Sequence, residues 1–194
     1  LLAAQSDFVE ARFRLALVWH KKGDWDKAAR QYEECVKAKE TWPEAWLNLG
    51  IVQGKLGRVQ EAETAFGRCL EQAPEDAEAM LGLAGAYLQA SRFEEARKLY
   101  RKLVERKPQH PEILFNAGLL EQKADNPQKA LELYTQAIAH RTEFAEAYLN
   151  LAIAQRTVGN EAEATKAFEK AIRLKPDLAK GYFALVPPGS PAVQ

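Results

Sequence analysis

Few side chains in this sequence are spaced in a way that could do catalytic or metal chemistry. The three histidines are His20, His110 and His140, and the two cysteines are Cys35 and Cys69. A zinc site usually draws ligands from close pairs of such residues. Even the nearest two, His20 and Cys35, are too far apart in sequence to form such a pair. We therefore predict no metal site, no cofactor and no catalytic residue.

Two further groups have a simple structural explanation. Gly82 and Gly85 resemble part of a phosphate-binding loop, but they lie within a predicted helix that no strand precedes. The paired glutamates Glu33-Glu34 and Glu94-Glu95 are expected to be solvated charges on outer helix faces. We therefore expect the function to depend on surfaces and not on reactive groups.

Composition narrows the function classes. Hydrophobic residues make up 47% of the 194 residues and charged residues 28%, which is typical of a folded protein. Lys+Arg and Asp+Glu number 27 each, so the chain lacks the basic excess that drives nucleic-acid binding. No apolar run approaches the roughly 20 residues that span a bilayer. We expect neither nucleic-acid binding nor membrane insertion.

The two cysteines stand at equivalent places of a repeat that runs through the whole chain. Numbering each unit from 1 to 34, position 8 is small, position 20 is alanine and position 24 is aromatic in every unit. The five units are 9–42, 43–76, 77–110, 111–144 and 145–178.

The second unit carries a recognisable signature. Its residues Trp46, Leu49, Gly50, Ala62, Phe66 and Pro74 resemble the tetratricopeptide repeat pattern. The resemblance implies an all-α, right-handed superhelical solenoid of antiparallel helix pairs, a helix A followed by a helix B. Small residues at positions 8 and 20 are then expected to let the helices approach closely, with the aromatic residue at position 24 between neighbouring units. The cysteines, at position 27, are expected to be small buried hydrophobes.

Several residues predict where helices begin, and one position departs from the usual family pattern. Pro43, Pro111 and Pro127 suit the first turn of a helix. Ser91, three residues before Glu94, predicts a capping box. Position 11, usually tyrosine in the family, is Gln53, Glu121 and Gln155 in three units, which we expect to be wetter sites.

The ends depart from the five units. Residues 1–8 continue the phase backwards and are predicted to be the end of a preceding helix B, with further repeats upstream. Residues 179–186 are expected to form a short helix that covers the last apolar face. The tail 187–194, which contains Pro187, Pro188 and Pro191, is predicted to be flexible.

The family resemblance implies that helices A line a concave surface. Positions 5 and 9 would give it an apolar strip, because residues four apart share one helix face. Asparagines at position 6 resemble the ladder that holds peptide backbone in the tetratricopeptide region of O-linked N-acetylglucosamine transferases, although only three rungs are present. The predicted partner-binding residues are Phe13, Leu17, Leu47, Asn48, Ile51, Leu81, Phe115, Asn116, Leu119, Leu149, Asn150 and Ile153.

Charges would flank this strip. Position 2 is glutamate in every unit, and positions 12 and 13 carry His20, Lys21, Lys55, Lys123 and Arg156. Both sets also suit the helix dipole, which favours acids at the start of a helix and bases at its end. Gly54, Gly82 and Gly85 add no side chains, so we predict the deepest depression there.

These features favour a non-enzymatic scaffold that binds a peptide or protein segment in its groove. Two alternatives stay open. The repeats could recruit substrate for a larger enzyme such as a glycosyltransferase. They could also self-assemble into a homo-oligomer through the groove or the terminal repeats.

Overall fold

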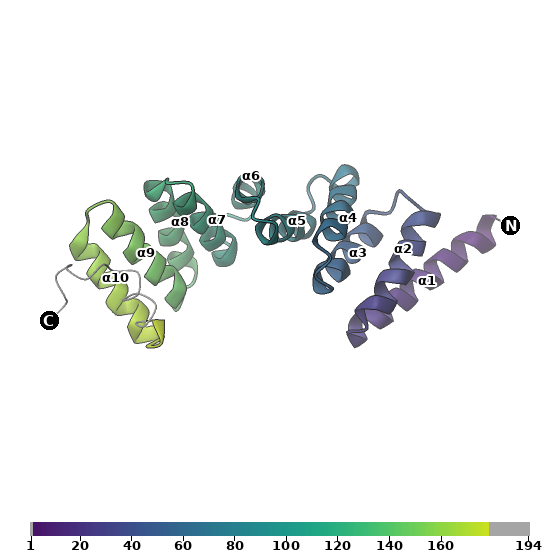
Figure 1. The fold of residues 1–194 in the computed structure, drawn as a ribbon, viewed down its shortest axis with the longest axis horizontal. Helices are drawn as coiled ribbons and strands as arrows, with labels where there is room; N and C mark the ends of the chain where they lie inside the picture. The colour runs from purple at the N-terminus through teal and green to yellow at the C-terminus, as the bar shows by residue number, and fades with distance from the viewer. Residues whose placement is uncertain (1, 179–194) are drawn as a thin grey trace. The chain divides into compact units, whose positions relative to one another are not determined.

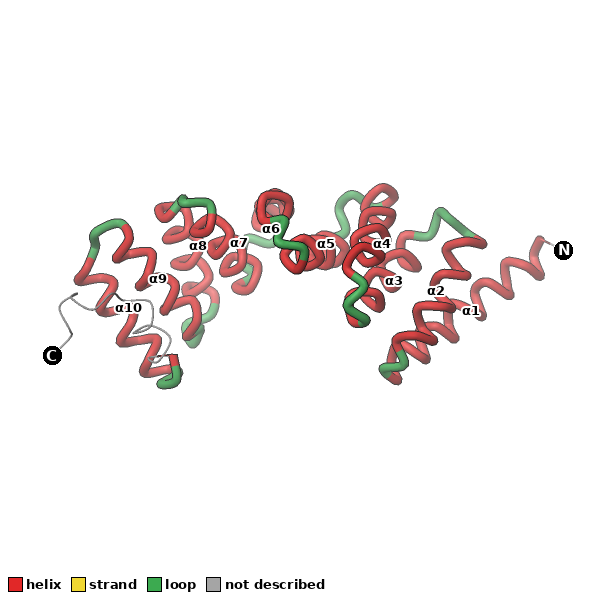
Figure 2. Tube along the Cα trace, viewed as in Figure 1, coloured by secondary structure: helices red, strands yellow, loops and turns green. Residues whose placement is uncertain are grey.

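The computed structural model describes residues 2–178, with side chains from residue 8 onward. Over that range it contains ten α-helices and no strands (Figures 1 and 2). The expected capping helix 179–186 and tail 187–194 lie outside the described residues. The helices are α1 (Leu2–Lys22), α2 (Trp25–Ala38), α3 (Pro43–Lys55), α4 (Val59–Gln72), α5 (Ala77–Gln89), α6 (Phe93–Arg106), α7 (Pro111–Lys123), α8 (Pro127–His140), α9 (Ala145–Thr157) and α10 (Glu161–Leu174).

The helices keep the period of the sequence. Each helix A from α3 to α9 begins at position 1 of its unit, and each helix B from α2 to α10 begins at position 17. Each pair of a helix A and the following helix B is antiparallel because only a short turn joins its members. The prolines predicted to open helices do so: Pro43, Pro111 and Pro127 occupy first-turn positions.

The turn within each pair depends on one residue with a left-handed backbone. Gly23, Gly57 and Gly159 have φ angles of 75°, 72° and 85°, and Ser91 and Asp125 have 58° and 59°. Glycine adopts this conformation at little cost. The capping box predicted at Ser91 is wrong, because Ser91 supplies the positive φ and α6 begins two residues later.

The described residues form two compact parts, one up to Leu99 (the N-terminal part) and one from Tyr100 onward (the C-terminal part), with the boundary inside α6. In the N-terminal part, α1 packs on α2, α2 on α3, α3 on α4 and α4 on α5. In the C-terminal part, α7 packs on α8, α8 on α9 and α9 on α10. Each part therefore buries its apolar faces by stacking successive helices.

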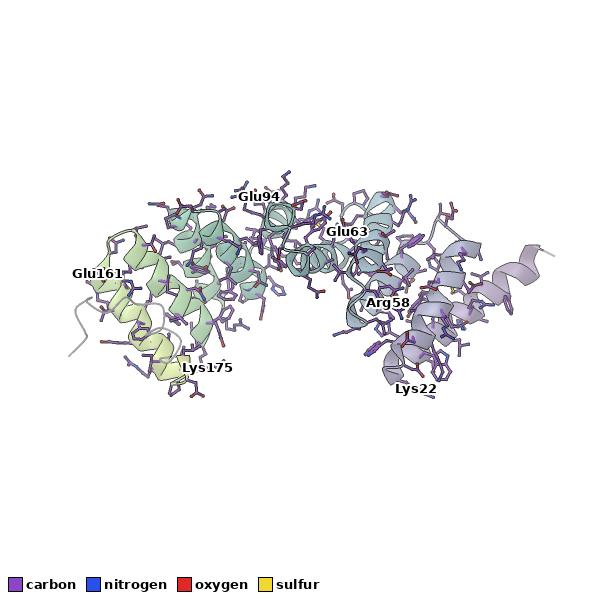
Figure 3. All side chains as sticks on the ribbon, in the orientation of Figure 1. Lys22, Arg58, Glu63, Glu94, Glu161 and Lys175 are labelled. Carbon is purple, nitrogen blue, oxygen red and sulfur yellow. The ribbon has the colours of Figure 1, made fainter. Side chains whose placement is uncertain are left out.

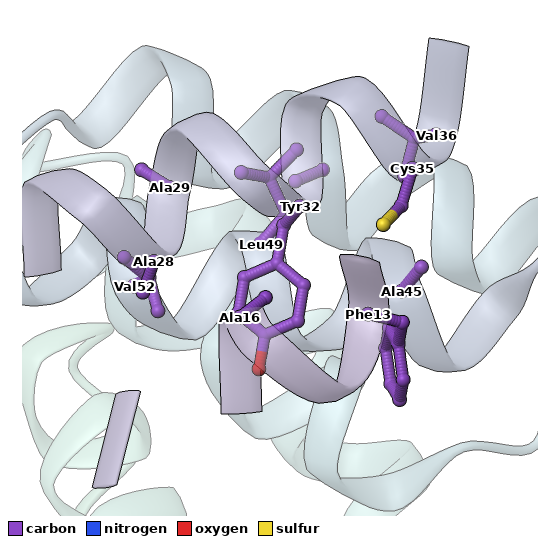
Figure 4. Packing of buried hydrophobic residues seen from close by; sticks show 11 residues of the cluster. Phe13, Ala16, Ala28, Ala29, Tyr32, Cys35, Val36, Ala45, Leu49 and Val52 are labelled. Carbon is purple, nitrogen blue, oxygen red and sulfur yellow. The ribbon is translucent and has the colours of Figure 1, made fainter. Parts of the chain in front are cut away.

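The predicted packing positions form the core. Ala16, Ala28 and Tyr32 are completely buried in the first pair, where Phe13 and Cys35 join them (Figure 4). The same positions are buried in every other unit. They are Gly50, Ala62 and Phe66; Ala84, Ala96 and Tyr100; Gly118, Ala130 and Tyr134; and Ala152, Ala164 and Phe168.

Position 8 must be small because the aromatic ring at position 24 lies directly over it. A Cβ atom built on Gly50 would lie 2.7 Å from the Phe66 ring. One built on Gly118 would lie 2.6 Å from the Tyr134 ring. Both distances are far inside van der Waals contact, so the predicted pairing of a small residue with an aromatic one is confirmed.

Position 11 was expected to be wetter than a core site, and that expectation is wrong in two units. Gln53 and Glu121 are each only 3% exposed. The Gln53 amide donates to Glu33 Oε1 at 2.9 Å, and Arg101 Nε donates to Glu121 Oε1 at 2.8 Å. Polar side chains of the preceding helix B thus satisfy these positions, so water is not needed there.

Residues 2–8 are not separated from the first unit. The segment predicted as the end of a preceding helix B continues without a break into α1, which runs from Leu2 to Lys22. Three of the five later connections contain a proline, at Pro74, Pro108 and Pro176, whereas position 32 is Glu40 and Thr142 in the other two. No proline or glycine, the residues that most often interrupt a helix, occurs between Leu2 and Lys22.

Candidate partner-binding surface on the A helices

The residues predicted to bind a partner are mostly accessible at the helix surface. Leu119 is the most exposed of them at 36%. The others that lie between the buried and exposed classes are Leu17, Leu47, Asn48, Ile51, Leu81, Phe115, Asn116, Leu149, Asn150 and Ile153. Each half-buried apolar side chain is anchored in the core and leaves part of its surface for a further contact.

Phe13 is a correction to the predicted set. It is only 4% exposed, and its ring packs 5.6 Å from that of Tyr32 and 4.5 Å from that of Trp42. Trp42 covers it because the last position of the first unit is aromatic. In the fourth unit Phe115 packs in the same way, 4.8 Å from Phe144, but keeps part of its surface open.

The asparagines at position 6 are partly engaged within the protein. Asn48 Nδ2 donates to Glu44 O, and Asn150 Nδ2 donates to Glu146 O, both at 2.8 Å. Burial raises the pKa of Tyr100, and the Asn116 side chain near its hydroxyl offsets part of that rise. Each bond of Asn48 and Asn150 uses one amide hydrogen, which leaves the second hydrogen and the carbonyl oxygen for a partner.

Some of the predicted acidic edge is neutralised. Glu112 forms an ion pair with Arg141, and Glu146 with Lys175 at 2.8 Å; Lys175 follows α10 (Figure 3). The hydrogen bond from Lys175 holds the pKa of Glu146 below its usual value. Arg141 and Lys175 both stand at position 31 of their units, whereas this position is Ala73 in the second unit. Within residues 8–178, Glu44 accordingly forms no ion pair. The edge is therefore uneven in charge.

A depression lies between α3 and α5, where the sequence predicted one. Its volume is about 290 Å³. Ile51, Phe66 and Leu81 contribute large apolar side chains to its lining, and Lys55 is the only charged residue that lines it. Gly50, Gly54, Val59, Ala62, Gly82, Gly85, Ala86 and Gln89 complete it. It brings together two predicted binding residues and all three predicted glycines.

A second depression, of about 310 Å³, was not predicted and is the larger of the two. It lies beside the loop that joins α2 to α3. Trp46 Nε1 and Gln72 Nε2 both donate to the carbonyl oxygen of Glu40 there, at 2.8 and 2.9 Å. Val36, Lys37, Thr41 and Arg68 complete the lining. Its residues come from α2, the loop after it, α3 and α4, and the loop residues Glu40 and Thr41 do not recur in the other units, so there was no reason in the sequence to expect it.

The titratable groups that could do chemistry are dispersed or buried. Cys35 and Cys69 are free and fully buried, and burial raises the pKa of each thiol to about 11. His20 contacts the Tyr32 hydroxyl at 3.4 Å, and burial followed by the Lys55 charge lowers its pKa. Within the described side chains, no three His, Cys, Asp or Glu residues are placed to hold a metal ion.

Membrane insertion has no candidate helix in the described chain. Between residues 2 and 178, no helix is both long and apolar enough to cross a bilayer.

Solved structures with the same fold are numerous. A crystal structure of the MamA protein superposes with a TM-score of 0.81 at 25% identity, over 94% of this chain and 100% of that one. A second MamA crystal structure gives 0.77 at 25% identity, over 85% and 96%. MamA residues 41 to the end from Desulfovibrio magneticus RS-1 gives 0.79 at 19% identity, over 87% and 96%.

The comparisons identify a family for this chain but no individual relative among curated sequences. Curated protein sequences give no match to this chain. The match of 420 solved chains shows that the architecture is common and does not by itself identify a partner. The tetratricopeptide repeat family matches residues 1–45, 47–111 and 115–179, which is most of the sequence. With helix pairs that recur at the period of its sequence, the chain belongs to the tetratricopeptide repeat family.

Proposed function

We propose that this chain is a non-enzymatic scaffold that binds a peptide segment on the surface formed by its A helices. Tetratricopeptide arrays are interaction scaffolds whose stacked helices create extended binding surfaces. The observation that carries the proposal is the set of half-buried apolar side chains at positions 5 and 9 within each part, beside asparagines with unused hydrogen-bonding capacity. Apolar contact would supply affinity, and the asparagines would pair with peptide backbone.

The test uses a random dodecapeptide library displayed on phage and selected on the wild-type chain. Peptides that are enriched are then measured on a variant that carries Leu47→Glu, Asn48→Glu and Ile51→Glu. We expect binding to fall at least about tenfold, because burying one aliphatic side chain is worth roughly 1.5–3 kcal/mol. Circular dichroism confirms that the variant keeps its helices.

A matched control variant carries Gln60→Glu and Thr64→Glu. Both side chains are exposed on α4, a B helix, and lie outside the depression between α3 and α5. This variant should bind the enriched peptides as the wild type does. Equal binding by wild type and the α3 variant, or failure of the library to enrich any peptide, would refute the proposal.

Self-association is a second candidate because α1 presents apolar side chains to solvent. Phe8, Leu15 and Val18 are 62%, 43% and 46% exposed. Light scattering over a concentration series tests it, and a constant monomeric mass would reject it. The other alternative, recruitment of substrate for a linked enzyme, is decided by the sequence that flanks this chain in its gene.

A further inference from the structure

The depression between α3 and α5 differs from the equivalent place between α7 and α9. Four positions that are small or apolar in the first carry larger or polar side chains in the second. Gly54, Phe66, Gly82 and Gly85 correspond to Gln122, Tyr134, Asn150 and Ile153. The repeat thus supplies an internal reference for the side chains that these positions can carry.

Two of these positions carry a hydrogen-bonded pair in the reference. The Tyr134 hydroxyl donates to Gln122 Oε1 at 2.8 Å. The first pair has a similar contact, His20 Nδ1 to the Tyr32 hydroxyl at 3.4 Å. In the second unit both partners are absent together, because Gly54 and Phe66 stand at these positions. Replacing both partners leaves no unsatisfied polar group, so the space opens without that penalty.

Close packing explains why one of the three positions Gly54, Gly82 and Gly85 must be glycine, but not the other two. A Cβ atom on Gly82 would lie 2.3 Å from the Phe66 ring, so a side chain cannot fit there. Nothing lies within 4 Å of a Cβ atom built on Gly54 or Gly85, although both are helical. A helix glycine is less stable than alanine by about 1 kcal/mol. The fold gains no packing from Gly54 and Gly85, and their shared effect is to keep this depression open.

Charge indicates what the depression would accept. Its lining is mostly apolar, with Gln89 as a neutral polar residue and Lys55 as the only charged one. Lys55 is exposed, and no carboxylate among residues 8–178 forms an ion pair with it. Its field reaches His20, whose pKa it helps to lower. The charge that complements this rim is a carboxylate.

We propose that this depression receives one bulky apolar side chain, preferably aromatic, from a partner peptide that carries a carboxylate beside it for Lys55. A volume of about 290 Å³ is at the small end of ligand pockets, which suits a single side chain. Aromatic side chains bury the most area and are the commonest anchors at interfaces. The inference rests on the proposed function and specifies its partner.

The test uses three defined dipeptides at millimolar concentration: N-acetyl-Trp-Glu-amide, N-acetyl-Ala-Glu-amide and N-acetyl-Trp-Lys-amide. Amide signals of ¹⁵N-labelled protein are followed, since Gly54, Gly82 and Gly85 report from the lining and Gly67 and Gly118 from elsewhere. We expect Trp-Glu to shift the first set selectively and to bind about tenfold or more tighter than Ala-Glu. Trp-Lys should bind about threefold weaker than Trp-Glu.

Two variants close the depression in different ways. Gly85→Leu fills it, and Gly54→Gln with Phe66→Tyr rebuilds the hydrogen bond seen at Tyr134 and Gln122. Both should abolish the shifts. Gly67→Ala on α4 is the matched control, because nothing lies within 4 Å of its Cβ position and it does not line the depression. It should bind as the wild type does.

The outcomes separate this inference from the proposed function. Absence of shifts at the lining glycines, equal shifts with Ala-Glu, or unchanged binding by both closed variants would overturn the inference. If the phage library then still enriches peptides that need Leu47 and Ile51, the proposed function stands without it. Selective dipeptide binding with no enriched peptide would instead support this site and contradict the broader surface.

Discussion

At the residue scale, the group that most needs partners inside the protein is the buried carboxylate of Glu121. Its side chain is 4% exposed and pairs with Arg101 at 2.8 Å, and Asn126 Nδ2 donates to its other oxygen at 3.0 Å. A buried charge is stable only when it is paired and hydrogen-bonded. The pairing joins the end of one unit to the start of the next, so it also favours one register of stacking.

Removing the partner of that carboxylate should therefore destabilise the C-terminal part. We expect Arg101→Ala to lower the free energy of unfolding by about 1–3 kcal/mol, because the charge of Glu121 loses a donor. Adding Glu121→Gln should restore part of the loss, since a neutral amide needs less compensation. Urea unfolding followed by circular dichroism measures both. An Arg101→Ala midpoint equal to that of the wild type would show that the ion pair contributes nothing.

The buried thiols predict a pH dependence at the same scale. Burial raises the pKa of Cys35 and Cys69 from an ordinary value of 9.0 to about 11. Between these values the folded chain keeps protons that the unfolded chain has lost. Stability should therefore be fully present below pH 9 and should fall as pH rises toward 11.

Burial also raises the pKa of Tyr32 and Tyr134 above 10.0, so the thiols must be isolated. The control is the double variant Cys35→Ala and Cys69→Ala, whose unfolding midpoint should decline less over the same pH range. Parallel declines in the two proteins would show that the thiols do not titrate differently on folding.

How far the sequence predicts such residues depends on whether they obey the repeat. Positions 8, 20 and 24 could be assigned because their roles recur in every unit. Phe13 could not, since its burial depends on Trp42, a residue whose position is aromatic in only some units. Gln53 and Glu121 were expected to be wet because their partners, Glu33 and Arg101, lie on the preceding helix, where the repeat does not point to them. Interactions between unlike residues of adjacent helices have no periodic signal.

At the element scale, α1 and α3 show that the neighbouring helix determines whether a residue at a given repeat position is buried. Leu15 and Leu49 occupy the same repeat position. Leu49 is 5% exposed and belongs to the core cluster that joins α3 to the first pair, whereas Leu15 is 43% exposed. The preceding helix B, α2, covers the face of α3. None of the described residues covers that face of α1.

This contrast predicts unequal costs for one substitution. Leu49→Gln should destabilise the chain by about 2–5 kcal/mol, because it removes buried apolar contacts. Leu15→Gln should stay within about 0.5 kcal/mol of the wild type, as surface changes usually do. Thermal unfolding measures both. A large loss for Leu15→Gln would mean that this face of α1 is covered in solution, and light scattering would then show an associated species.

At the scale of the whole molecule, stability in a helical repeat is close to a sum of local terms and contacts between neighbours. Such chains need not unfold in one step, so different probes can report different midpoints. This chain has a convenient asymmetry, because its four tryptophans are Trp19, Trp25, Trp42 and Trp46. Fluorescence therefore reports on the first two helix pairs, and circular dichroism on every helix.

A closely packed glycine in each part makes the prediction specific. Gly118→Ala places a Cβ atom 2.6 Å from the Tyr134 ring, and Gly50→Ala places one 2.7 Å from the Phe66 ring. Overpacking of this kind costs about 1–3 kcal/mol. If the two parts unfold separately, Gly118→Ala should lower the midpoint seen by circular dichroism and leave the fluorescence midpoint nearly unchanged. Gly50→Ala should lower the fluorescence midpoint. Equal shifts in both probes for both variants would show instead that contacts between neighbouring units couple the whole array into one cooperative transition.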